Sequence, residues 1–222
     1  MTRPDPDPSR GADSGPGPGS STVTGLPEPP SAPLLPPLPP RFPGPDEPVR
    51  VAGEGLVLRE WTRADVPAMT ALFDDPDVAR FTPLASPFDE AAARAYLTRG
   101  EEARAEGHKV QWAVTTDGDT PLGEVLLFTT PENRFDIEAG YVIGPRHRGQ
   151  GLAVRALRIV TAYAYDTLGA RRVLLRIVAE NAASAAVARS AGFGRADLPP
   201  IRSGEALLDT WQHGGVPDDG RA

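Results

Sequence analysis

Residues 141–155 have the sequence YVIGPRHRGQGLAVR, and this stretch decides the fold of the chain. It contains an apolar strand, a basic and glycine-rich loop that begins with a proline, and the first turn of an amphipathic helix. This order leaves backbone N–H groups without partners at the positive end of a helix dipole. Gly149 and Gly151 permit positive φ and carry no Cβ that would hold a ligand away from the backbone. The stretch therefore predicts a binding place for a phosphate group.

The loop does not match the two commonest phosphate-binding motifs. The P-loop pattern G-x-x-x-x-G-K-[ST] requires a lysine after a glycine, and this loop has none. The dinucleotide pattern G-x-G-x-x-G requires a third glycine, and Val154 stands in its place. The loop does match R-x-x-G-x-A, which runs from Arg148 through Gly151 to Ala153, and Arg146 and Arg148 add positive charge.

Helix and strand alternate after the loop. Apolar residues recur at helical spacing over 151–168, and Gly169 is a typical helix stop. The β-branched and apolar run at 173–178 predicts a buried strand. Asn181 is a good N-cap for an alanine-rich helix that ends at Gly192. This order predicts a helical crossover between two parallel strands.

Two of these motifs together resemble a known family. The loop is similar to the pyrophosphate loop Q/R-x-x-G-x-G/A of the GCN5-related N-acetyltransferases, the GNAT superfamily. NAASAAVARSAGF at 181–193 resembles the element N-x-x-S-x-x-V-A-x-x-x-G-F that follows that loop in these enzymes. LVLREWTRAD at 56–65 and EAGYVIGPRHRGQGLA at 138–153 are most similar to the RimJ/RimL-like branch. Members of that branch acetylate protein N-termini, notably of ribosomal proteins, or small amines.

The remaining pattern predicts an α/β domain with a mixed sheet. We expect strands at 56–61, 110–115, 122–129 and 135–143, helices from Thr62 to about Phe73 and after Pro87, and a C-terminal pairing of 194–202 with 205–212. The resemblance implies the GNAT acyl-CoA N-acyltransferase fold. In that fold a mostly antiparallel sheet holds one parallel crossover, here 135–143 with 173–178, and helices cover both faces.

Composition divides the chain into three parts. Sixteen of the 26 prolines fall in residues 1–48, which predicts a disordered tail with polyproline II character. Within it, LLPPLPPR at 34–41 contains a PxxP spacing that suits either an aromatic docking groove or a tail with no such role. We expect the acetyltransferase domain over 49–213 and a second disordered tail over 214–222.

Residue usage excludes several functions. The absence of cysteine excludes disulfides, thiolate metal sites and a cysteine nucleophile. The three histidines lack metal-ligand spacing, so we expect no metal. The formal net charge of −7 disfavours a nucleic-acid partner and suits an amine-bearing acceptor. Nothing in the chain has the length of an apolar membrane span or the apolar core of a signal peptide, so we expect a soluble, cytoplasmic protein that does not bind membranes, either monomeric or homodimeric.

The resemblance also implies which residues bind acetyl-CoA. In this family the strand before the loop offers backbone groups to the pantetheine arm, and the loop amides hold the pyrophosphate. Asn181 has two roles open to it, because helix capping alone explains an asparagine there. The expected cofactor-binding residues are Tyr141, Val142, Ile143, Arg148, Gly149, Gln150, Gly151, Leu152, Ala153 and Asn181.

Acetyl transfer to an amine further needs a base for the amine and an acid for the leaving thiolate. The family pattern E-x-G-Y matches residues 138–141, so Glu138 is the first candidate base and Glu124 the second. Many relatives carry a tyrosine acid seven residues after the motif asparagine, but here that position is Ala188. Ser184 is the nearest hydroxyl substitute; alternatively the thiolate leaves into solvent unassisted.

Three functions are consistent with these patterns. The first is an acetyl-CoA-dependent N-acetyltransferase that transfers acetyl to a primary amine, on a protein N-terminus or a small molecule, by direct attack in a ternary complex. The second is a GNAT-fold module that binds acyl-CoA as a sensor with weak turnover, which the alanine at 188 favours. The third is a nucleotide-binding α/β protein unrelated to CoA, which the missing third glycine and P-loop lysine disfavour.

Overall fold

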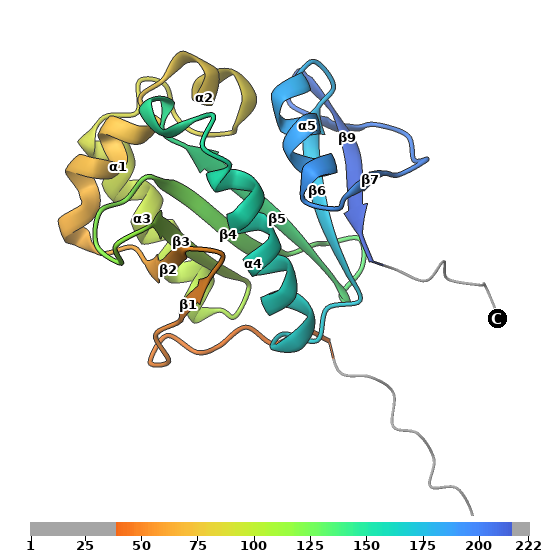
Figure 1. The fold of residues 1–222 in the computed structure, drawn as a ribbon, viewed down its shortest axis with the longest axis horizontal. Helices are drawn as coiled ribbons and strands as arrows, with labels where there is room; N and C mark the ends of the chain where they lie inside the picture. The colour runs from red at the N-terminus through yellow and green to blue at the C-terminus, as the bar shows by residue number, and fades with distance from the viewer. Residues whose placement is uncertain (1–38, 215–222) are drawn as a thin grey trace, which may run out of the picture. The chain divides into compact units, whose positions relative to one another are not determined.

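A computed structural model of the protein describes residues 39–214. Within them a nine-stranded sheet has the order β1-β2-β3-β4-β5-β6-β9-β7, with β8 also paired to β9 (Figure 1). The strands are β1 (Arg50–Gly53), β2 (Leu56–Glu60), β3 (Lys109–Thr115), β4 (Gly123–Thr129), β5 (Asp136–Ile143), β6 (Arg172–Val178), β7 (Gly194–Arg195), β8 (Ile201–Ser203) and β9 (Ala206–His213). All paired strands are antiparallel except β5 and β6, which run parallel. The predicted mixed sheet with one parallel crossover is confirmed.

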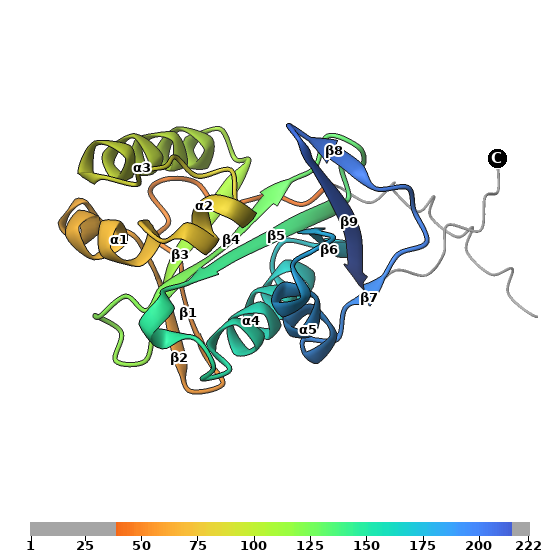
Figure 2. The same ribbon diagram turned by 90° about the horizontal axis from the view of Figure 1, so that it is seen from above.

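Helices cover both faces of this sheet (Figure 2). They are the 3-10 turns η1 (Arg63–Asp65) and η2 (Pro145–His147) and the helices α1 (Val66–Phe73), α2 (Pro76–Phe81), α3 (Glu90–Ala105), α4 (Leu152–Asp166) and α5 (Ala182–Ser190). The first three α-helices lie on one face, and α4 and α5 lie on the other. The sheet therefore separates two layers, and the crossover helix α4 joins the two parallel strands.

The main core lies between the sheet and α4. Ala156, Leu157, Val160 and Ala164 are fully buried, as their helical spacing predicts. They pack against strand residues that alternate toward the same face, of which Ile137 is one. This packing fixes where α4 begins, and so it fixes the glycine loop that precedes the helix.

A smaller core holds the other layer together. Phe73 of α1 meets Phe88 with 5.4 Å between ring centroids and Tyr96 of α3 with 6.4 Å. Val78 of α2 is buried in the same cluster. Val142 of β5 packs against its edge, so this layer reaches the strand that leads into the glycine loop.

Two elements were not predicted from the sequence. β1 pairs with β2 through a tight turn at Glu54 and Gly55, both with positive φ, at 48° and 72°. α2 begins at Pro76, where the sequence predicted only the end of the preceding helix. The C-terminal pairing is confirmed for β8 and β9, with its turn at Gly204 and Glu205.

The folded domain begins earlier than residue 49, its predicted start. Phe42 is 3% exposed and belongs to the main core. Arg104 of α3 donates hydrogen bonds to the carbonyls of Pro43 and Glu47. Residues 39–48, assigned to the tail from their proline content, therefore pack on the domain. Of the tails expected over 1–48 and 214–222, residues 1–38 and 215–222 lie outside the described residues, and so does most of the 34–41 proline motif.

Candidate active site

The two parallel strands separate along their length. β5 pairs with β6 only from Asp136 to Glu138, opposite Arg172 to Leu174. On its other side β5 pairs with β4 from Ile137 to Ile143. The edge of β5 that faces β6 therefore has no strand partner beyond Glu138, although backbone groups require hydrogen-bond partners. We call this opening, between residues 139–143 of β5 and residues 175–178 of β6, the wedge.

The glycine loop lies at the open end of the wedge. Gly149 has φ 76° and Gly151 has φ 71°, and a Cβ built on either would meet nothing within 4 Å. Gly151 is the N-cap of α4 and offers no side chain to the free N–H groups of the first turn. The loop thus combines open space with unpartnered amides at the N-terminus of a fifteen-residue helix. These features suit an anion site of the kind that the sequence predicted, and anion binding at this loop stays a prediction.

The expected cofactor residues differ in what they can offer. Tyr141 and Val142 are half-buried at the wedge, whereas Gly149, Gln150 and Gly151 are exposed in the loop. Ile143, Leu152 and Ala153 are buried in the main core. Their side chains are therefore unavailable, and only their backbone groups could reach a ligand.

Arg148 is placed differently from what its motif position suggests. Its Nη2 lies 2.7 Å from Asp75 Oδ1, its Nη1 lies 2.9 Å from Asp77 Oδ2, and its Nε donates to the Ile143 carbonyl at 3.2 Å. The guanidinium that was expected to add positive charge to the loop is thus bound to the carboxylates of Asp75, the N-cap of α2, and Asp77 of α2. No spacing along the chain could have shown these partners, which lie more than seventy residues away.

Asn181 acts as the predicted helix cap. Its Oδ1 accepts a hydrogen bond from the Ser184 N–H at 3.0 Å and so begins α5. Capping accounts for the side-chain oxygen, and none of the described hydrogen bonds uses the amide nitrogen. A cofactor contact for Asn181 stays a prediction.

Glu138 lies where the strand pairing ends. Its Oε2 is 3.5 Å from Arg176 Nε, and its side chain is 18% exposed. Burial raises the pKa of Glu138 to about 7, and the charge of Arg176 opposes that rise. A carboxyl with this pKa exchanges protons near neutrality, as a base for an amine must.

Glu124, the second candidate base, is closed off from solvent. Its side chain is 1% exposed within β4, and its Oε1 accepts a hydrogen bond of 2.5 Å from the Tyr96 hydroxyl. Burial raises its pKa to about 7, opposed by that hydrogen bond, by Lys109 and by the nearby indole of Trp61. Neither Glu124 Oε2 nor Trp61 Nε1 has a hydrogen-bond partner among the described residues.

The structure adds the Tyr141 side chain as a candidate proton donor; the sequence had suggested only a backbone contact to the cofactor for this residue. The Tyr141 hydroxyl is buried and has no well-formed hydrogen bond among the described residues. Burial raises its pKa, and the nearby Ser184 opposes that rise. Ala188 is fully buried in the main core, so a tyrosine at that position would not fit. Tyr141 and the neighbouring Ser184 are therefore the candidate hydroxyl donors at the wedge.

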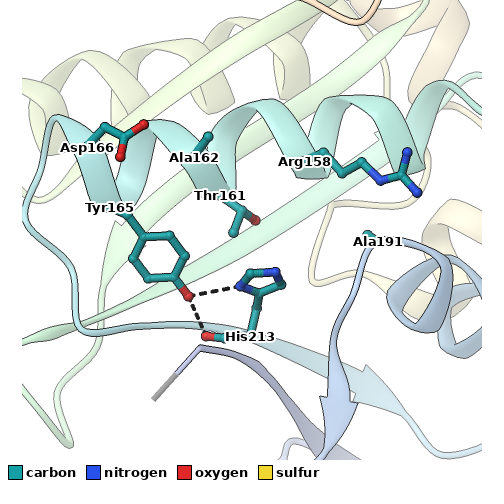
Figure 3. Close-up of a pocket in the computed structure, with 7 residues that line it drawn as sticks. All are labelled: Arg158, Thr161, Ala162, Tyr165, Asp166, Ala191 and His213. Carbon is teal, nitrogen blue, oxygen red and sulfur yellow. Dashed lines mark hydrogen bonds between the residues drawn. The ribbon is translucent and has the colours of Figure 1, made fainter. Parts of the chain in front are cut away.

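A hollow lies on a different surface. It has a volume of about 300 Å³ and lies beside α4 (Figure 3). There the Tyr165 hydroxyl donates to the His213 carbonyl at 2.5 Å and lies 3.0 Å from His213 Nδ1. The hollow contains none of the expected site residues and no uncapped helix N-terminus. We therefore locate the candidate site at the wedge, where the glycine loop and the free strand edge meet.

A split α/β sheet with a glycine loop at its open end suits an extended ligand that carries phosphate groups. Among the described residues, no three metal-binding side chains cluster, and no helix has both the length and the apolar character of a membrane span.

Comparison with known proteins gives the family. The model of the acetyltransferase (GNAT) domain matches residues 55–194, which include the wedge, the loop and the Asn181 cap. The chain belongs to the GNAT acetyltransferase family, as its motifs predicted. Enzymes of this family use acetyl-CoA.

Individual relatives agree with this assignment. An uncharacterized N-acetyltransferase, p20 of Bacillus licheniformis, is 23% identical over 146 residues, which cover 65% of this chain and 82% of that protein. Mycobacterium smegmatis RimJ in complex with CoA-disulfide superposes with a TM-score of 0.62 at 18% identity, over 76% of this chain and 86% of that one. The apo form of RimL, a ribosomal L7/L12 alpha-N-protein acetyltransferase, superposes with a TM-score of 0.64 at 16% identity. The superposition covers 78% of this chain and 98% of that one. The fold is thus shared with RimJ and RimL, the branch that the sequence resembles.

Proposed function

We propose that the protein is an acetyl-CoA-dependent N-acetyltransferase that acetylates a primary amine by direct attack in a ternary complex. The observation that carries this proposal is the wedge between β5 and β6, which opens toward the glycine loop and the free space over its glycines. An extended thioester ligand needs both parts at once. The free strand edge suits its amide-bearing arm, and the loop amides suit its diphosphate.

The residues at the wedge suit the two proton transfers. Glu138, with its pKa near 7, would accept a proton from the amine, directly or through water. An ordinary alkylamine with a pKa of about 10.4 is almost wholly charged at neutral pH, so it needs such a base more than an N-terminal amine does. On the leaving side, Ser184 and the Tyr141 hydroxyl are the groups that could donate a proton to the thiolate.

Acetyl-CoA supplies the activated acetyl group, and the protein supplies position. The chain has no cysteine to carry an acetyl intermediate, which favours direct transfer between bound substrates. Initial rates measured against both substrates should then give intersecting lines, whereas a ping-pong scheme gives parallel lines.

The acceptor class follows the family resemblance. RimL is named for acetylating the alpha-amine of ribosomal L7/L12, so peptide N-termini are the first acceptors to test. Carboxylates near the wedge also suit a positively charged acceptor. Glu138 is half-buried there and Glu132, near the same arginine, is 54% exposed, so a cationic amine would be attracted.

The test is a screen for free CoA released from acetyl-CoA in the presence of peptides with free N-termini, lysine peptides and small polyamines. We expect amine-dependent CoA release above the rate without amine. The competing function is an acyl-CoA sensor with little turnover. Tight acetyl-CoA binding by calorimetry together with no amine-dependent release would favour the sensor, and no binding at all would contradict both.

A further inference from the structure

Arg148 joins the glycine loop to α2. Its three donor nitrogens are engaged by Asp75, Asp77 and the Ile143 carbonyl, all within 3.2 Å. The Arg148 side chain is 38% exposed, and Asp75 is only 14% exposed. A forked guanidinium that meets two carboxylates is a geometrically specific contact, stronger than a single exposed ion pair.

Asp75 has a second task at the same place. Its Oδ1 also accepts hydrogen bonds from the N–H groups of Asp77 and Val78, which makes it the N-cap of α2. Burial by itself would raise the pKa of Asp75, but the hydrogen bonds from Arg148 and Val78 outweigh it and lower the pKa. One carboxylate therefore both begins α2 and binds the arginine of the loop.

A close contact between Gly144 and Leu72 is a second link between the glycine loop and the helical layer that contains α1 and α2. A Cβ on Gly144, just before the loop, would overlap the Leu72 side chain of α1. α1 and α2 belong to the layer whose small core reaches Val142 at the wedge. The loop is thus held against the helices that face the wedge from the side opposite α4 (Figures 1 and 2).

The Arg148 contacts also argue against a direct bond from this side chain to a phosphate. A phosphate would have to displace two carboxylates from the guanidinium or lie beside their negative charge. The loop amides at Gly149 and Gly151 belong instead to residues with free space beside them, since a Cβ on either glycine would meet no atom within 4 Å. They are the better anion ligands.

We propose that Arg148 is a positioning residue that transmits cofactor binding at the glycine loop to α2, rather than a ligand of the cofactor phosphates. Ordering of the loop by the cofactor stiffens α2 through the Asp75 and Asp77 contacts, so the layer that faces the wedge becomes ordered once the cofactor is bound. Such a coupling between two regions amounts to a shared free energy and can be measured from either side. The inference rests on the proposed CoA site.

Three proteins test it: the wild type, Arg148→Ala, and the double variant Asp75→Asn with Asp77→Asn. Asparagine is as good an N-cap as aspartate, so the double variant keeps the helix cap while it removes the ion pairs. The measurements are the Kd of CoA by calorimetry and the amide hydrogen exchange of a peptide covering residues 76–82, with and without CoA. Arg148→Lys serves as the conservative variant, since a lysine can keep one ion pair but not the fork.

In the wild type we expect CoA to slow exchange in 76–82 by about fivefold or more, in the range of ordinary couplings. In Arg148→Ala and in the double variant we expect the slowing to be lost and CoA binding to weaken alike in both, by no more than about tenfold, because the coupling is reciprocal. Arg148→Lys should restore part of the slowing.

Two results would overturn the inference while leaving the CoA site intact. One is slowing that persists in Arg148→Ala. The other is the result expected of a direct phosphate ligand. In that case Arg148→Ala would weaken CoA binding more than about tenfold, and the double variant would strengthen it because the arginine is freed from its carboxylates. A wild type that bound no CoA would instead contradict the proposed function, and this inference with it.

Discussion

The Glu138 carboxylate lies 3.5 Å from the Arg176 guanidinium, at the last residue where β5 and β6 pair. Arg176 is itself 10% exposed, bonds to the Thr210 hydroxyl and lies 3.8 Å from Glu132. Its charge is thus divided between two carboxylates. Because burial outweighs this divided charge, the pKa of Glu138 rises to about 7 instead of falling.

The first prediction concerns the pH dependence of the reaction. If Glu138 is the base, it must be ionised, so kcat/KM for an amine acceptor should rise with pH through about 7. Glu138→Gln should lower kcat by about 100-fold, within the usual range for loss of a general base, and should abolish that limb of the profile. Rates across the neutral range, with several points on either side of the Glu138 pKa, provide the measurement. Glu132→Gln, which removes the other carboxylate near Arg176, is the matched control and should keep the limb.

The second prediction concerns stability. The folded state raises the pKa of Glu124 from the ordinary 4.5 to about 7, so it holds the proton more tightly than the unfolded chain. The contribution of this group is therefore complete below about pH 4.5 and is lost as pH rises to 7, by up to about 3 kcal/mol. Glu124→Gln, which cannot ionise, should flatten the pH dependence of the unfolding free energy over that same range. Urea unfolding at several pH values gives the comparison.

Glu138 contributes to the same pH dependence, because burial raises its pKa to about 7 as well. Glu138→Gln should therefore flatten the curve by a similar amount, and the double variant with Glu124→Gln should flatten it further than either change alone. A Glu124→Gln protein whose stability still fell as steeply as that of the wild type would show that the buried carboxyl is not the source.

The parts of the fold that the sequence predicted are those with strong local signals. Gly149, Gly151 and the apolar period of the following helix define the strand–loop–helix unit, and Asn181 defines the next helix start. All of these signals come from residues within one or two helical turns of each other, and local sequence patterns predict structure over that range. Burial of the apolar face then makes the helix position unambiguous.

The elements that the sequence missed depend on longer-range or ambiguous signals. Asp75 and Pro76 suit a helix stop as well as a helix start, and here they are the N-cap and first residue of α2. Phe42 lies among prolines and glycines, so only its contacts in the main core show that its segment is folded. Arg148 matched a phosphate motif, but its partners Asp75 and Asp77 lie far away in the sequence. Ion pairs between residues far apart in the sequence produce no periodic pattern, so a single sequence does not predict them.

The third prediction tests the glycine loop. Gly151→Leu places a side chain in the open space over the loop and should reduce CoA binding more than about 100-fold, since a bulky group there excludes the diphosphate. Gly169→Leu is the matched control. Gly169 lies at the opposite end of the same helix with φ 77° and equally open space, so it carries the same backbone strain away from the loop. Calorimetry with CoA should show binding lost only in the first variant, and equal binding by both variants would refute the loop assignment.

The fourth prediction distinguishes the effect of the Tyr141 hydroxyl on stability from its effect on catalysis. Its hydroxyl has no well-formed partner among the described residues, so Tyr141→Phe should unfold at the same temperature as the wild type or higher. If the hydroxyl assists the leaving thiolate, kcat should nevertheless fall by about tenfold or more. Ser184→Ala, which keeps the Asn181 cap because only the backbone N–H is used, should show a similar fall if the two hydroxyls act together. Unchanged kcat in both variants would indicate that the thiolate leaves into solvent.

The fifth prediction concerns the N-terminal boundary of the domain. Phe42 is 3% exposed among core residues, so Phe42→Ala should lower the free energy of unfolding by about 3 kcal/mol. This value is at the lower end of the range for truncation of a buried phenylalanine, because the segment around Phe42 can relax into the space left. Leu198→Ala is the control, because Leu198 is 56% exposed and its truncation should change stability by less than about 0.5 kcal/mol. Chemical denaturation of both variants measures the difference. Since Arg104 holds the carbonyls of Pro43 and Glu47, a chain shortened to begin at residue 49 should lose those bonds together with the ring and should be destabilised at least as much as Phe42→Ala. A shortened chain as stable as the wild type would show that the segment only rests on the surface of a domain that is complete without it.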